Sequence, residues 1–70
     1  MTFWSVTIPT RTTHGTPGSH MFIVNADRYE DARNHALTQA DLPKSRRHRR
    51  NAALNIQALA VTELTARWGL

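Results

Sequence analysis

Basic side chains are concentrated in one short segment of this 70-residue chain, the seven positions from Lys44 to Arg50. Five of the nine Lys and Arg residues lie there, whereas the other positions carry four basic and five acidic residues, so the net charge of +4 is local. Guanidinium and ammonium groups clustered in this way are suited to bind phosphate oxygens. We therefore predict contacts with the phosphate backbone of DNA or RNA by five side chains: Lys44, Arg46, Arg47, Arg49 and Arg50.

The predicted position of this basic run favours an anionic ligand. A helix is expected from about residue 45 to residue 68, which places the arginines in its first turns. Cations there oppose the helix dipole by about 0.3–1 kcal/mol each, and Arg46 and Arg50 repel each other at a spacing of four. Phosphate would offset this cost, because the unpaired backbone N–H groups of a helix start also point toward it.

Two other interpretations of the basic run remain open. Charge runs are usually solvated surface turns, and the arginine-rich composition raises the chance of such a turn. The second function class is a protein-interaction module that docks on a cellular partner through the basic turn or through the apolar face of the second helix. A membrane surface is disfavoured as the partner, because no bulky apolar residue alternates with the arginines.

The remaining polar residues do not predict catalysis. The four histidines have no metal-ligand spacing and the chain has no cysteine, so we expect neither a metal site nor a cofactor. No serine lies in a nucleophile motif. Asp27 and Glu30 are explained as a helix N-cap and the residue that completes a capping box. We therefore predict a non-enzymatic accessory or regulatory protein.

The element pattern predicts a single α+β domain in the order β-β-α-α. Alternating and β-branched residues favour strands at about residues 2–8 and 20–24, with Pro9 ending the first strand. Helices are expected at about residues 28–41 and 45–68, the first with a narrow apolar stripe formed by Tyr29, Ala32, Ala36 and Ala40.

Aromatic residues divide between the two faces of the first strand. Trp4 and Phe22 are expected in the core, because the chain has few other large apolar side chains. Phe3 lies on the opposite face from Trp4, and it is the best candidate for an exposed residue that stacks on a base or forms an interface.

The chain is short for a stable monomer, and it contains no cysteine that could form a disulfide. The apolar band along the second predicted helix is broader than a hairpin and an alanine-lined helix can cover. We therefore expect a homodimer formed through that helix, with five interface residues: Ile56, Leu59, Ala60, Leu64 and Trp68.

The N-terminal residues alternate between apolar and polar types, and the longest apolar runs are only about four residues. This pattern predicts neither a signal peptide nor a membrane span. A cytoplasmic location is therefore expected.

Overall fold

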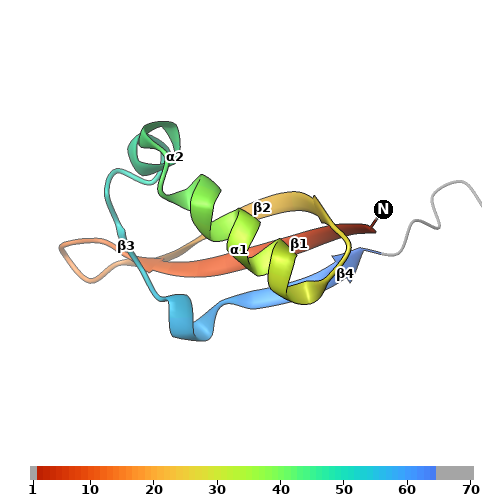
Figure 1. The fold of residues 1–70 in the computed structure, drawn as a ribbon. Helices are drawn as coiled ribbons and strands as arrows, with labels where there is room; N and C mark the ends of the chain where they lie inside the picture. The colour runs from red at the N-terminus through yellow and green to blue at the C-terminus, as the bar shows by residue number, and fades with distance from the viewer. Residues whose placement is uncertain (1, 65–70) are drawn as a thin grey trace, which may run out of the picture.

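The computed structural model describes residues 2–64. It contains one antiparallel sheet of four strands, two helices and a single 3₁₀ turn, η1 (Figure 1). The elements run in the order β1 (Thr2–Arg11), β2 (Pro17–Ala26), α1 (Tyr29–Ala40), α2 (Pro43–His48), β3 (Ala53–Leu54), η1 (Ile56–Ala58) and β4 (Ala60–Leu64).

β1 is the central strand of the sheet. It pairs along its full length with β2, from Thr2 opposite Ala26 to Arg11 opposite Pro17. Its other edge pairs with β4 near one end and with β3 near the other. α1 lies across one face of this sheet (Figure 1), and the other face has no helix against it among the described residues.

Pro9 does not end β1, as we expected it to, because it lies where the strand needs no donor. β4 pairs with β1 up to Thr7 and β3 resumes the pairing at Thr10, so Pro9 faces the gap between them. Its carbonyl accepts a hydrogen bond from the Asn55 amide at 2.8 Å on that same edge. The N–H that proline lacks would point toward the same edge, where no strand residue pairs with Pro9.

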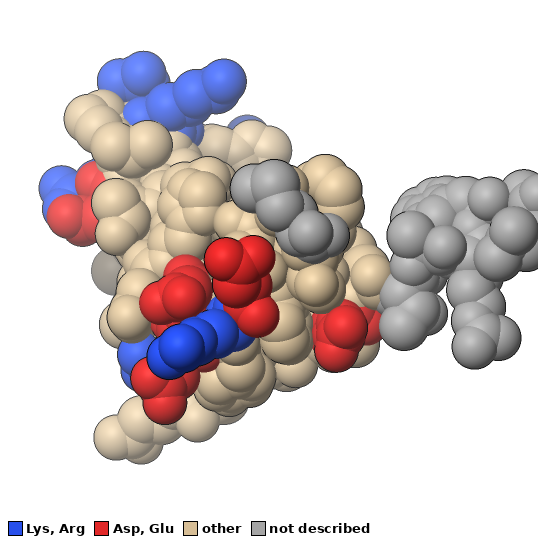
Figure 2. Space-filling model, turned by 45° about the vertical axis from the view of Figure 1, so that its right-hand side comes forward, with Lys and Arg blue, Asp and Glu red and all other residues tan. Residues whose placement is uncertain are grey.

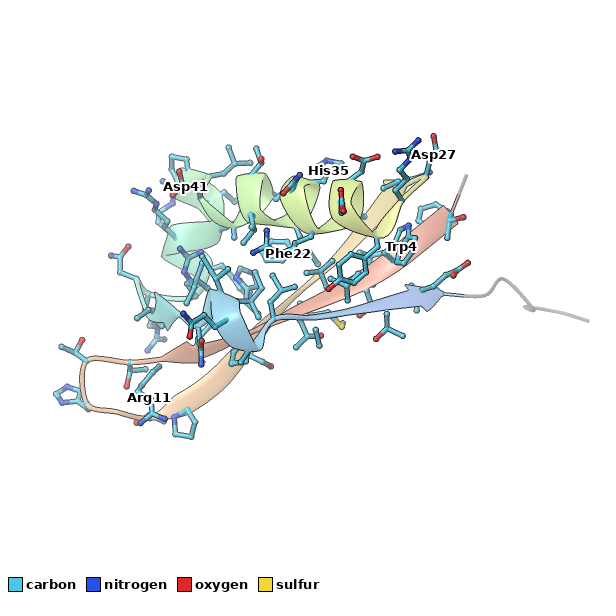
Figure 3. All side chains as sticks on the ribbon, turned by 60° about the horizontal axis from the view of Figure 1, so that its bottom comes forward. Trp4, Arg11, Phe22, Asp27, His35 and Asp41 are labelled. Carbon is cyan, nitrogen blue, oxygen red and sulfur yellow. The ribbon has the colours of Figure 1, made fainter. Side chains whose placement is uncertain are left out.

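The core lies between the sheet and α1. Ala32, Ala36 and Ala40 are fully buried, which confirms these three positions of the expected stripe, whereas Tyr29 is 51% exposed. They pack against apolar side chains of β1 and β2, among which Phe22 lies between the sheet and α1 (Figure 3). Trp4 is partly buried beside the same cluster, and its indole N–H donates to the Ala26 carbonyl at 2.8 Å.

The predicted β-β-α-α order is wrong, because the chain continues from α2 into two further strands. The first two strands and the first helix are present, but the helix expected over 45–68 ends at His48. Arg50 and Asn51 then adopt left-handed conformations, with φ of 53° and 59°, which no α-helix continues through. Leu54, Leu59 and Val61 still reach the core, although they do so from β3, from the end of η1 and from β4.

The long helix that was expected to form the dimer interface is absent, so the predicted interface residues between 56 and 64 do not lie on one helix face. Leu59 packs against the protein's own core, Ala60 and Leu64 belong to β4, and Ile56 lies on η1. Trp68 falls outside the described residues. A second correction concerns the start of α1, where the cap position is Arg28 and no side chain provides a capping hydrogen bond, so the expected Asp27 cap is absent.

None of the helices within residues 2–64 has the length and apolar character needed to cross a membrane.

Candidate functional site

The basic run forms the short helix α2 and the turn that follows it. Pro43 occupies the first turn of α2, where its missing N–H is not needed. The helix ends in a Schellman motif, in which the Arg50 amide donates to Arg47 and the Asn51 amide donates to Arg46 at 2.9 Å. Arg50 occupies the left-handed position that glycine usually takes in this motif.

This geometry reverses the expected relation between the arginines and the helix dipole. Arg46 and Arg47 lie in the last turn of α2 rather than in the first turn of a long helix. Cations at a helix C-terminus interact favourably with its dipole. The predicted electrostatic strain of the run is therefore absent, and an interaction with phosphate must be supported by other observations.

Arg49 is the member of the run that the fold itself uses. Its side chain is partly buried, and its guanidinium donates one hydrogen bond to the carbonyl of Ala40, the last residue of α1. It donates a second to the carbonyl of Ala52 at 3.2 Å. Since α1 has no basic residue in its own last turn, Arg49 supplies that helix with a cation and a donor at its C-terminus. These contacts occupy two sides of the guanidinium, and we omit Arg49 from the ligand-binding set.

Arg46 forms an ion pair with Asp41, just beyond the end of α1. Hydrogen bonding and charge from Arg46 hold the pKa of the Asp41 carboxyl below its usual value. The two side chains are 52% and 74% exposed, so water screens the pair and its strength is modest. A phosphate can compete with Asp41 for a guanidinium held in this way.

The remaining cations of the run are exposed. We call Lys44, Arg46, Arg47 and Arg50 the basic corner, since all four side chains lie on the surface at one end of the molecule. The Arg46–Asp41 pair is the one ion pair found within residues 2–64. Figure 2 shows blue Lys and Arg side chains projecting from the end where α2 lies, whereas red carboxylates surround the basic groups near the start of α1.

A surface depression lies beside the basic corner and adds neutral hydrogen-bonding groups to it. It is lined by His20, Gln39, Leu42, Lys44, Ser45, Arg47 and His48. The ring of His20 contacts that of Phe22, with centroids 4.3 Å apart, and lies 5.2 Å from that of His48. Partial burial, followed by electrostatic repulsion from His48 and Arg49, lowers the pKa of His20.

The pairing of His20 with His48 has no signal in the sequence. The two residues are 28 positions apart, on β2 and α2, and they meet because α1 carries the chain back along the sheet to the same end. Across residues 2–64, no group of three or more His, Cys, Asp or Glu side chains converges in a way that could hold a metal ion.

The aromatic residues lie as the alternation of β1 predicts. Phe22 is buried in the core, Trp4 packs beside it, and Phe3 is exposed on the opposite face of the sheet. Phe3 is therefore separated by the sheet from the depression and from α1.

Comparison with protein-family models, with curated proteins and with solved structures finds no match for this chain. Its function must therefore be inferred from its own geometry and charge.

Proposed function

We propose that this protein binds nucleic acid through phosphate contacts made by the basic corner. The observation that carries the proposal is the exposure of four cationic side chains at one end of the molecule, with Asp41 as the one carboxylate that pairs among them. Guanidinium groups match phosphate geometry, because their planar N–H donors can bind two oxygens at once.

Long-range charge supports the same orientation. Residues 41–50 carry five basic side chains and one acidic one, a net charge of +4, while the rest of the described chain carries three basic and four acidic residues, a net charge of −1. α1 separates the acidic start of the helix from the corner by about 18 Å. This separation exceeds the Debye length of about 8 Å at physiological salt. A polyanion is therefore attracted to the corner rather than to the molecule as a whole.

The number of free cations sets the expected strength. Lys44, Arg47 and Arg50 form no ion pair with another described residue, whereas Arg46 is shared with Asp41. Each phosphate neutralised on duplex DNA contributes about −0.9 to the slope of log K against log salt, so three contacts give a slope of roughly −3. The affinity expected at physiological salt is in the range of non-specific binders, with Kd of about 10⁻⁴–10⁻⁶ M.

We infer that the protein acts as a small accessory factor in the cytoplasm, where nucleic acid is abundant. Gln39, Ser45 and His20 in the adjacent depression offer further hydrogen bonds to phosphate or sugar oxygens. These three side chains do not define a preference for particular bases. Titration with DNA and with RNA distinguishes the two ligands.

Fluorescence anisotropy with labelled duplex DNA and a structured RNA, measured over a salt series, tests the proposal. Arg47→Gln combined with Arg50→Gln should weaken binding at least tenfold at low salt and reduce the salt slope by about 1.8. The matched control is Arg28→Gln combined with Arg33→Gln, which removes two arginines at the start of α1, far from the corner. The control should stay within about twofold of the parent protein.

Two results would contradict the proposal. Equal weakening in both double variants would show that net charge alone, and not the corner, attracts the ligand. No binding of either nucleic acid at low salt would reject the function itself. The interaction-module hypothesis would then be the one to pursue.

A further inference from the structure

The sheet face opposite α1 forms an apolar surface. Alternate residues of β1, β2 and β4 point to this side, because cross-strand partners share a face. We call this surface the open face. It consists of Phe3, Ser5, Thr7, Met21, Ile23, Asn25, Ala60, Thr62 and Leu64.

Large apolar side chains gather on the part of the open face formed by β1 and β2. Phe3, Met21 and Ile23 are 51%, 59% and 52% exposed. Ile23 lies opposite Ser5 and diagonal to Phe3, which is within reach of contact on a pleated sheet. Three such residues in one patch differ from the single exposed apolar side chains that are normal on protein surfaces.

The open face carries no charged residue. The next residue with a charge along this side of β1 is Arg11, four positions beyond Thr7, or about 13 Å. Nucleic acid and anionic membranes bind surfaces that supply cations. A partner for the open face must instead be neutral and largely apolar, and a second copy of the same face meets both conditions.

The core on the α1 side of the sheet consists largely of small side chains, so it gives a single chain limited stability. Half of the eight buried core residues within the described chain are alanines, and α1 contributes only alanines to that set. Val6, Ile8 and Val24 are the largest fully buried side chains. A domain of this size gains little stability from such a core, so covering the second face would add substantially to it.

We propose that the open face is the interface of a homodimer, in which two sheets pack face to face. Strands spaced ~4.8 Å apart and rising ~3.3 Å per residue give the nine residues of this face a projected area on the order of 300 Å². With side-chain relief, two copies bury roughly 900 Å², which is the size of a weak and transient interface. This area fits a dimer with a Kd in the micromolar range.

Sedimentation equilibrium from low to high micromolar protein tests the proposal with a matched pair of variants. Ile23→Lys places a charge within the apolar patch of the open face, at a residue that is 52% exposed in the monomer. It should weaken dimerisation roughly 100-fold, or about tenfold for each of the two isoleucines. Ile56→Lys makes the same change at a residue that is 42% exposed on η1, outside the open face, and should dimerise like the parent.

A cross-linking measurement keeps the test independent of any effect of Ile23→Lys on folding. The chain has no cysteine, so Ser5→Cys introduces a single thiol in the middle of the open face. A short bis-maleimide should join two Ser5→Cys chains, whereas Thr38→Cys on the exposed surface of α1 should remain unlinked.

Three results would overturn the proposal. One is a parent protein that remains monomeric at high micromolar concentration. The second is a dimer that tolerates Ile23→Lys with both variants folded, as expected if the free edge of β2 forms the contact. The third is cross-linking through Thr38→Cys in preference to Ser5→Cys.

Discussion

Arginines only a few positions apart in this chain have different roles, and their surroundings decide which. Arg49 is bonded to the Ala40 and Ala52 carbonyls and joins the end of α1 to the segment that leads into β3. Arg47, two positions earlier, is exposed beside a surface depression. Removing the hydrogen-bond donor of a buried carbonyl destabilises a protein far more than removing an exposed guanidinium that is already in water.

This difference predicts unequal effects on stability for the same substitution at the two positions. Arg49→Gln should lower the free energy of unfolding by about 1.5–3 kcal/mol, because two carbonyls lose a charged donor. Arg47→Gln should change it by less than about 0.5 kcal/mol and should weaken the proposed nucleic-acid binding. Urea denaturation of the two variants at one protein concentration provides the measurement. An Arg49→Gln variant as stable as the parent would mean that the Arg49 contacts contribute nothing to stability.

At the scale of elements, the end of α2 determines the fold of the second half of the chain. The Schellman motif turns the backbone at Arg50 and Asn51, and the following residues then extend along the free edge of β1. A non-glycine residue in the left-handed region is about 1–2 kcal/mol less stable than in a right-handed one. Asn51 tolerates this conformation better than Arg50, because asparagine can bond locally to its own backbone.

Glycine at the first of these positions should therefore stabilise the protein. We expect Arg50→Gly to raise the free energy of unfolding by about 0.5–1 kcal/mol, after allowance for the greater entropy of glycine in the unfolded chain. Asn51→Gly should give a smaller gain. Thermal or urea unfolding of both variants decides the order. A loss of stability in Arg50→Gly would show that the arginine side chain makes contacts that outweigh its backbone strain.

The elements that the sequence predicted are those whose pattern is local. The alternation around Trp4 and the alanine spacing of α1 each specify one structure, and both are present. The segment from Ala58 to Leu64 fits two patterns, because its apolar residues suit both a helical band and an alternating strand. The free edge of β1 decides between them, and only the tertiary structure reveals that edge.

The candidate site shows the same limit. The clustering of Lys and Arg between residues 44 and 50 is visible in the sequence, so the basic corner could be located in advance. The different roles of its arginines could not be predicted from the sequence. The partners of Arg46 and Arg49 are Asp41 and the Ala40 carbonyl, and both lie at the end of a preceding helix. No glycine, the residue that commonly marks a helix end, follows His48 directly, so the sequence does not predict that α2 stops there.

At the scale of the whole molecule, a sheet covered by a helix on one side couples stability to assembly. The molecule is elongated, with extents of 44 × 21 × 21 Å, and its core is confined to the space beneath α1. If two open faces pack together, each protomer gains a second apolar layer that exists only in the dimer. Unfolding then competes with association, and the stability of the fold depends on protein concentration.

The melting temperature should therefore rise with protein concentration. A hundredfold increase above the dimer Kd adds up to about 2.7 kcal/mol per dimer, which corresponds to a rise of roughly 9 °C for a chain of this length. Ile23→Lys should melt at a temperature independent of concentration, whereas Ile56→Lys should follow the parent. Thermal unfolding at several concentrations measures this dependence without nucleic acid. The dimer proposal and the phosphate-binding proposal can therefore each be rejected independently of the other. A parent Tm that stays constant would place all of the stabilising contacts within one chain, and the apolar side chains of the open face would then be exposed in the native state.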